Sequence, residues 1–219
     1  MTKNLSLGVL ISGGGTNLQA LINACSDPDY PASISLVISN RDDAKGLDRA
    51  RKADIKCLVI PHTNFKNREA FDKKICNALL DADIDLVCLA GFMRILGSPF
   101  VDFWKNRLIN IHPSLLPSFK GLNTHLEALK AGVRITGCTV HFVRNELDCG
   151  PIIAQAAVPV LPDDTEQSLA KRVLDQEHLL YPLAIELIAR NRIKITNDVV
   201  QISGANRNYK NVLINPDFE

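Results

Sequence analysis

The sequence predicts an α/β protein with a Rossmann-like fold: a mostly parallel, twisted sheet of about seven strands, with helices on both faces and an antiparallel C-terminal hairpin. Short apolar runs rich in Val, Ile and Leu alternate with amphipathic stretches of helical period through the first half of the chain. Three consecutive glycines, Gly13–Gly15, join the first apolar run to the first amphipathic stretch. In such sheets ligands bind beyond the carboxyl ends of the strands, so the turns at that edge are the candidate functional segments.

Each predicted element rests on its own pattern. Apolar runs bounded by Gly, Pro, Asn or Ser predict strands at residues 5–12, 33–39, 57–60 and 86–90, and from Leu108 onward. Apolar spacings of three and four predict helices after Gly15 and at residues 46–52, 67–80, 100–104, 124–131 and about 165–190. Residues 135–143 and 152–160 are expected to pair as an antiparallel hairpin with a wide loop. Pro182 is expected to kink or divide the last helix, and residues 193–202 contain a strand-like segment.

Composition and charge narrow the range of partners and compartments. The 219 residues suffice for one substantial domain, and a net charge of +1 gives no general attraction to nucleic acid or to an anionic membrane. The N-terminus enters a strand pattern without a secretory segment, and the longest apolar run, residues 84–93, is too short to span a bilayer. Six cysteines without any C-x-x-C pair favour free thiols in a reducing cytoplasm. We therefore expect a cytoplasmic monomer or homodimer that acts on small molecules.

The glycine turn, residues 13–17, has the arrangement in which backbone N–H groups and a helix dipole hold an anion. It does not match the dinucleotide pattern G-x-G-x-x-G, because Leu18 occupies the position of the third glycine. It is not a P-loop either, because no Gly-Lys-Ser/Thr follows. A single phosphate is therefore favoured as its ligand, and the alternative is a tight turn that needs glycine only for its geometry.

Asn110 and His112 stand at the end of the fifth predicted strand, directly before Pro113. Residues two apart in a strand point to the same side, so the amide and the imidazole are neighbours. The amide N–H can polarise a carbonyl group, and the imidazole can transfer a proton near neutral pH. The alternative is structural: a histidine satisfied in a turn and an asparagine that bonds its own backbone.

Five motifs occur in order along the chain: SGGGTNL from Ser12, AGFMRIL from Ala90, NIHPSLLP from Asn110, GCTVHFV followed by LDCGPII from Gly137, and QEHLLYP from Gln176. With these motifs the sequence resembles the phosphoribosylglycinamide formyltransferases, folate-dependent enzymes of purine synthesis. NIHPSLLP followed by Asp148 is specific for the formyl-folate transferase and hydrolase fold. The resemblance implies a formyltransferase domain at residues 1–195, with a phosphate-binding half (1–105) and a catalytic and folate-binding half (106–195), and a C-terminal tail at 196–219.

The resemblance also implies a reaction and a set of site residues. The reaction transfers the formyl group of 10-formyltetrahydrofolate to the amine of glycinamide ribonucleotide in de novo purine biosynthesis, by direct attack and without a metal. The implied catalytic residues are Asn110, His112 and Asp148. The implied ligands of glycinamide ribonucleotide are Gly15, Thr16, Asn17 and Glu177. The implied folate-binding residues are Arg68, Met93, Arg94, Ile95, Leu96, Asn110, Arg144, Asn145, Glu146 and Leu147.

Other functions stay open at this point. A formyltetrahydrofolate hydrolase would use the same motifs with water as the acceptor. A non-catalytic module that binds a nucleotide monophosphate would keep the glycine turn but would have no use for His112 together with Asp148. An NAD-dependent dehydrogenase is weakened by the missing third glycine. We expect neither the N-terminal regulatory domain of the hydrolases nor the C-terminal RNA-binding domain of the tRNA formyltransferases.

Overall fold

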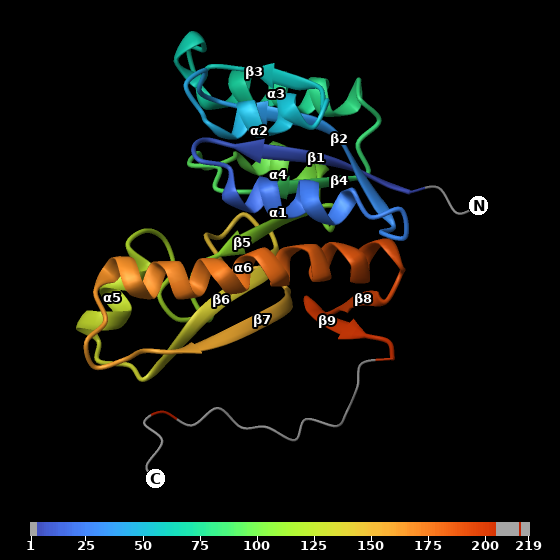
Figure 1. The fold of residues 1–219 in the computed structure, drawn as a ribbon. Helices are drawn as coiled ribbons and strands as arrows, with labels where there is room; N and C mark the ends of the chain where they lie inside the picture. Colours follow the sequence, from blue (N-terminus) through green and yellow to red (C-terminus); the bar gives the residue numbers. More distant parts are fainter. Residues whose placement is uncertain (1–3, 205–214, 216–219) are drawn as a thin grey trace. The chain divides into compact units, whose positions relative to one another are not determined.

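The computed structural model of this protein describes residues 4–204 and Asn215. Its strands are β1 (Leu5–Ile11), β2 (Ala32–Ser39), β3 (Cys57–Val59), β4 (Leu86–Leu89), β5 (Leu108–His112), β6 (Ile135–Phe142), β7 (Ile152–Pro159), β8 (Ile193–Thr196) and β9 (Val199–Ile202). Its helices are α1 (Thr16–Cys25), α2 (Gly46–Lys52), α3 (Arg68–Leu80), α4 (Ser98–Phe103), α5 (Thr124–Lys130) and α6 (Glu166–Ala189), with a 3₁₀ turn at His62–Asn64. Figure 1 shows these elements along the chain.

Seven strands form one sheet in the order β3-β2-β1-β4-β5-β6-β7, and β8 pairs with β9 in a separate sheet. The pairs from β3 to β5 are parallel, whereas β6 and β7 are antiparallel. The predicted mostly parallel α/β sheet with an antiparallel C-terminal hairpin is therefore confirmed. The chain divides into two compact units, one ending at residue 110 and including 142–145, the other comprising 111–141 and the residues from 146 onward. The domain of residues 1–195 and the tail at 196–219 stay predictions.

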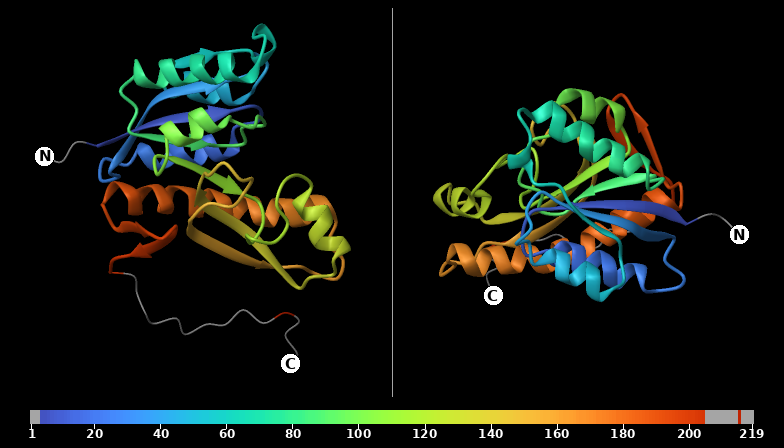
Figure 2. Two further views of the ribbon diagram at one scale, coloured as in Figure 1. Left: turned by 180° about the vertical axis from the view of Figure 1, so that it is seen from behind. Right: turned by 90° about the horizontal axis from the view of Figure 1, so that it is seen from above.

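The first unit is a parallel sheet covered by helices on both faces. Helices α1 and α2 lie on one face and α3 and α4 on the other, as Figure 2 shows. Because both faces are covered, the central strands are buried almost throughout: every residue of β4 is buried, and so are all residues of β1 after Leu5, including the polar Ser6. Ile75 of α3, Phe100 of α4 and Trp104, which follows α4, belong to the core under this sheet.

The direction in which successive strands are added to the sheet reverses between β1 and β4. From β1 the sheet extends through β2 and β3 on one side, and through β4 and β5 on the other. The carboxyl ends of β1 and β4 are paired as far as Ala90, whose N–H donates to the carbonyl oxygen of Leu10 at 2.9 Å. Parallel sheets bind ligands at such a switch point, because the two following loops diverge there and leave the strand ends accessible. The glycine turn follows β1, and the segment Gly91–Leu96 follows β4.

The second unit contains the antiparallel hairpin β6–β7 and the long helix α6. The hairpin pairs Ile135 with Pro159 at one end and His141 with Ile152 at the other. Helix α6 contacts β7 and α5. Its apolar side, which includes Val173, is buried, and this burial fixes the helix to the hairpin.

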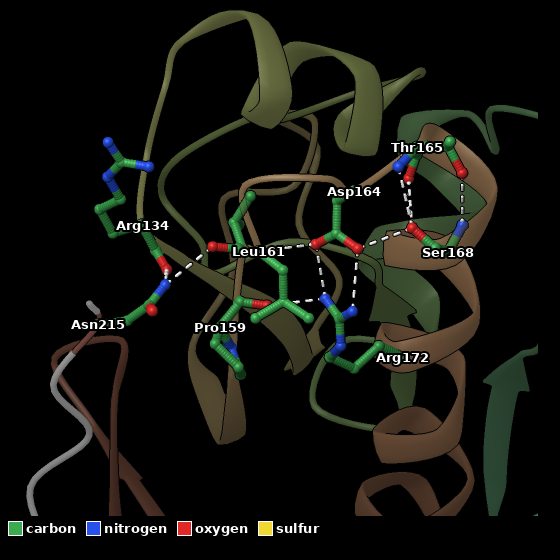
Figure 3. Close-up of polar contacts among 9 residues, drawn as sticks. Arg134, Pro159, Leu161, Asp164, Thr165, Ser168, Arg172 and Asn215 are labelled. Carbon is green, nitrogen blue, oxygen red and sulfur yellow. Dashed lines mark hydrogen bonds and ion pairs between the residues drawn. The ribbon is translucent and has the colours of Figure 1, made fainter. Parts of the chain in front are cut away.

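A dense polar cluster marks the start of α6 (Figure 3). Thr165 and Ser168 form a reciprocal capping box, which satisfies two backbone N–H groups at the helix start. The Asp164 carboxylate accepts two hydrogen bonds from the Arg172 guanidinium, at 2.7 and 2.9 Å, one from Ser168 Oγ at 2.7 Å and one from Leu161 N at 2.8 Å. These donors, Arg172 first, hold the pKa of the Asp164 carboxyl well below its usual range.

The expectation that Pro182 would divide the last helix is wrong. Helix α6 runs through Pro182 as one element of 24 residues. A proline removes one helical N–H and costs roughly 3 kcal/mol in an isolated helix. Leu180 and Tyr181 before it, and Ala184 and Ile185 after it, are all buried. Packing on both sides of the proline therefore outweighs the local preference to break.

The C-terminal segment differs from its prediction in one detail. The strand-like stretch at residues 193–202 consists of two strands, β8 and β9, which pair antiparallel from Ile193–Ile202 to Thr196–Val199. Most of the predicted C-terminal tail, residues 205–214 and 216–219, lies outside the described part of the chain. Asn215 is described: its Nδ2 donates to the carbonyl oxygens of Arg134 at 2.6 Å and Val160 at 2.9 Å, at the end of the β6–β7 hairpin (Figure 3).

Candidate functional site

The glycine loop, residues 13–17, has the geometry of an anion site. Gly15 is the N-cap of α1 and adopts left-handed backbone angles, φ 68° and ψ 33°, which favour glycine. A Cβ atom at Gly15 would lie 2.5 Å from the Cα atom of Gly46, so the close approach of α2 excludes a side chain as well. No side chain caps the N-terminus of α1. Its first backbone N–H groups are those that a helix leaves without an intrahelical acceptor, which suits a bound anion.

A buried serine joins the glycine loop to the loop after β4. Ser12 Oγ accepts a hydrogen bond from Met93 N at 2.8 Å and donates to Asn40 Oδ1 at 2.6 Å. Asn40 Nδ2 is in turn 3.2 Å from His62 Nδ1. The structure therefore brings together, within the first unit, the predicted phosphate loop and the predicted folate segment. Sequence reasoning missed these links, because Ser12 and Asn40 merely follow apolar strands in the sequence.

The segment Met93–Leu96 combines exposed residues with one buried residue. Met93 and Ile95 expose 66% and 64% of their surface, unusually much for large apolar side chains, and so could contact an apolar ligand. Arg94 is exposed beside them. Leu96, which was predicted to line the folate pocket, is only 9% exposed and packs into the core of the first unit. It anchors the segment while its neighbours face outward.

Asp72 supports this segment from α3, a role that nothing in the neighbouring sequence indicates. Its Oδ2 accepts a hydrogen bond from Gly97 N at 2.7 Å, and the residue is 5% exposed. Burial raises the pKa of the Asp72 carboxyl, although the Gly97 N–H and the positive charges of Arg68 and Arg94 oppose that rise. Arg68, at the start of α3, is exposed. The two predicted folate-binding arginines, Arg68 and Arg94, thus both lie near one buried carboxyl group.

The second unit contains a buried histidine–carboxylate pair. His112 Nδ1 is 3.5 Å from Asp148 Oδ2, and the two side chains are 6% and 9% exposed. His112 Nε2 donates to the carbonyl oxygen of Phe119 at 2.9 Å, and Asp148 Oδ2 accepts from Gly121 N at 2.9 Å. Phe119 and Asp148 have φ angles of 52° and 47°, a left-handed conformation that costs roughly 1 kcal/mol or more for residues other than glycine. This pair of predicted catalytic residues therefore meets at short range in a tightly held loop.

Asn110 and His112 are both in β5, two positions apart. That their side chains share one face of the strand stays a prediction from strand alternation. A second histidine, His141 on β6, was not predicted as a site residue. Its Nε2 is 3.9 Å from Asp148 Oδ1, and its side chain is 2% exposed. The sequence signal for it is its place in the motif GCTVHFV, residues 137–143.

The remaining predicted residues make contacts of their own. Arg144 and Asn145 donate to the side chains of Asn106 and Asp102, at 2.8 and 2.9 Å. The loop then continues with Glu146 and Leu147, both exposed: Glu146 Oε1 is 3.9 Å from Lys120 Nζ, and Leu147 exposes 53% of its surface. Glu177 is buried in α6, 6% exposed, and its charge helps to raise the pKa of the neighbouring Cys138 thiol to about 12, after burial as the larger cause.

A surface pocket of about 660 Å³ lies between α1 and α2, and none of the glycine-loop residues 13–17 lines it. Its charged lining residues are Lys45, Arg49, Lys52 and the acidic Asp48. None of the predicted folate-binding residues lines it. Across residues 4–204 no helix is both long and apolar enough to cross a membrane.

The fold is that of a doubly wound α/β protein, with a glycine turn at the switch point of its first unit and a buried imidazole–carboxylate pair in its second. Comparison with known proteins gives the family. The formyl transferase family matches residues 6–185. The chain belongs to this family.

Individual relatives agree with that assignment. The chain is 45% identical to the phosphoribosylglycinamide formyltransferase of Escherichia coli strain K12, over 91% of this chain and 94% of that protein. It resembles the crystal structure of glycinamide ribonucleotide transformylase 1 from Symbiobacterium toebii, with a TM-score of 0.90 and 47% identity over 92% and 95% of the two chains. It is 51% identical to the human trifunctional purine biosynthetic protein adenosine-3 over 88% of this chain, which corresponds to 19% of that longer protein.

Proposed function

We propose that this protein transfers the formyl group from N10 of 10-formyltetrahydrofolate to the amine of glycinamide ribonucleotide, a step of de novo purine biosynthesis. The observation that supports it most directly is the buried pair of His112 and Asp148, 3.5 Å apart, in a chain of the formyl transferase family. Relatives that match over nearly their whole length carry the transferase name, which favours transfer over hydrolysis.

The proposed chemistry is direct attack of the neutral amine on the formyl carbon. A tetrahedral oxyanion develops, and the Asn110 amide N–H and the positive charge of protonated His112 would stabilise it. The attacking amine must lose a proton and the departing folate nitrogen must gain one, and His112 would relay them directly or through water. Asp148 would hold the imidazole in place through its carboxylate. The reaction as written requires neither a covalent enzyme intermediate nor a metal.

The substrate sites in this proposal follow the two loops at the switch point. Gly15, Thr16 and Asn17 would bind the phosphate of glycinamide ribonucleotide through the N-terminus of α1. Met93, Arg94 and Ile95 would face the folate, with Arg68, Asn110 and residues 144–147, and Leu96 would hold the segment from beneath. Glu177 would bind the glycinamide end. The enzyme would act in the cytoplasm on free small molecules, as a monomer or homodimer, without nucleic acid or membrane partners.

A coupled assay tests the proposal. Purified protein is mixed with glycinamide ribonucleotide and a 10-formyl folate, and folate absorbance is followed while the formylated product is measured by mass spectrometry. Formylation of the amine supports the transferase. Formate release without an amine acceptor would identify a hydrolase instead. Binding of the ribonucleotide with neither reaction would identify a non-catalytic binding module.

A further inference from the structure

Three consecutive carbonyl oxygens of the glycine loop accept hydrogen bonds from elsewhere in the first unit. The oxygen of Gly13 accepts from Gly46 N at 3.0 Å, and that of Gly15 accepts from Gln19 N at 2.9 Å. Between them, the oxygen of Gly14 accepts from Nε of Arg49 at 2.9 Å. Arg49 lies on α2, 35 residues away along the chain. Of these three donors it is the only side chain, and therefore the only one that a substitution can remove.

These bonds decide where the loop's N–H groups point. A trans peptide group is planar, and its N–H points opposite to its C=O. Because Gly46 and Arg49 hold the carbonyl groups of Gly13 and Gly14 toward α2, the N–H groups of Gly14 and Gly15 must both point away from α2. Successive N–H groups that converge in this way, next to a left-handed residue such as Gly15, form a concave anion site. Arg49 therefore fixes the orientation of a donor without facing the anion itself.

The guanidinium group of Arg49 is itself held in place. Its NH1 donates to Gln19 Oε1 on α1 at 3.2 Å, so the side chain bridges α1, α2 and the loop. It is half-buried, and among the described residues no carboxylate pairs with it. The neighbouring Asp48 is paired instead with Arg51, at 2.9 Å. The charge of Arg49 is thus not neutralised locally and adds positive potential next to the loop.

We propose that Arg49 is a positioning residue for the substrate phosphate: through the Gly14 carbonyl group it pre-orients the backbone donors of the glycine loop, and it thereby sets the affinity for the phosphorylated amine. This rests on the proposed function, which takes the phosphate of glycinamide ribonucleotide as the ligand of the loop. Without the side chain the Gly13–Gly15 segment can rotate its peptide groups, since glycine tolerates most backbone angles. Ordering it again would then cost part of the binding free energy.

The test compares Arg49→Met with the wild type on two acceptors, glycinamide ribonucleotide and its dephosphorylated riboside. A hydrogen bond from a charged group corresponds to roughly a tenfold to hundredfold change in an equilibrium constant. We expect KM for the ribonucleotide to rise by about that factor, with kcat and the KM for 10-formyltetrahydrofolate within about threefold of wild type. The kcat/KM for the riboside is expected to stay unchanged. Arg51→Met, which removes the same charge from the same helix, is the matched control and should behave as wild type.

Two further measurements separate the possible failures. Arg49→Lys keeps the positive charge but loses the planar guanidinium group, and we expect its KM for the ribonucleotide to stay several-fold above that of the wild type. A wild-type KM in Arg49→Lys would mean that charge attraction alone is sufficient, and it would overturn the proposal. Equal loss on ribonucleotide and riboside, or no loss in Arg49→Met, would also overturn it. Calorimetric binding of ribose 5-phosphate needs no catalysis. If the wild type binds this probe and Arg49→Met binds it at least tenfold more weakly, the inference holds even where formyl transfer is absent; equal binding refutes it.

Discussion

Replacing Asp148 by asparagine removes one charge from the His112 pair while preserving the loop around it. The oxygen of the new amide can still accept the hydrogen bond that Gly121 N donates at 2.9 Å. The charge itself lies 3.5 Å from His112 Nδ1, and its side chain is only 9% exposed, so water screens it little. At an effective dielectric constant of about 20, opposite unit charges at this distance attract by about 5 kcal/mol.

That figure is an upper limit for the stabilisation of an imidazolium group that forms during the reaction. Since about 1.4 kcal/mol corresponds to a factor of ten, we expect kcat of Asp148→Asn to fall by about two to three orders of magnitude. The measurement is steady-state formyl transfer at saturating concentrations of both substrates, with far-ultraviolet circular dichroism to verify the fold. Glu127→Gln, an equivalent change at an exposed position of α5, is the control. A loss of less than about tenfold would refute the assignment of Asp148 to the catalytic pair.

Three other substitutions test separate parts of the structure. Asn110→Ala should lower kcat by about two to three orders of magnitude if the amide stabilises the oxyanion, and a loss below about threefold in the same assay would reject that role. Asp164→Asn should lower the free energy of unfolding by roughly 2–4 kcal/mol at pH 7, because Arg172 loses its buried partner. The folded-state pKa of Asp164 is depressed, so this stabilisation is complete above the unfolded pKa near 4 and is lost as the pH falls; urea unfolding of wild type and variant should converge in acid, and a constant difference down to pH 2 would contradict it. Ser12→Ala should raise KM for both substrates several-fold, because Met93 loses its link to the glycine loop, and an effect on one substrate alone would disprove that coupling.

Local sequence patterns predicted the fold, because strands that are covered by helices on both faces of a sheet need apolar residues at nearly every position. The run ending at Leu89 is apolar throughout, and the run ending at Ile11 is apolar apart from Ser6. Such runs are typical of central parallel strands, which are covered on both faces. Helix limits followed from spacing and capping residues in the same way. Pro182 was the exception, because its local preference competes with the packing of α6, and the strength of that packing is set by residues far away in the sequence.

The sequence could predict only those parts of the candidate site in which the arrangement of the residues is determined within one short segment of the chain. Gly15 and the pair Asn110 and His112 belong to such segments, so their arrangement follows from turn chemistry and strand alternation. Arg49 and Asp72 do not: each acts on a loop through a hydrogen bond across the fold, to the Gly14 carbonyl group and to the Gly97 N–H. Nothing in the neighbouring sequence of either residue indicates that partner.

Each of the two units holds its own candidate functional groups, and the two do so in opposite ways. In the first unit the expected ligand contacts are backbone N–H groups, and side chains such as Arg49 hold that backbone from behind. In the second unit the reacting groups are side chains, and backbone groups hold them: the Phe119 carbonyl group binds His112, and the Gly121 N–H binds Asp148. A substitution in the glycine loop changes a side chain, whereas the expected phosphate contacts there are backbone N–H groups. The glycine loop therefore has to be tested through the side chains that hold its backbone, such as Arg49, and the His112–Asp148 pair through substitution of the two residues themselves.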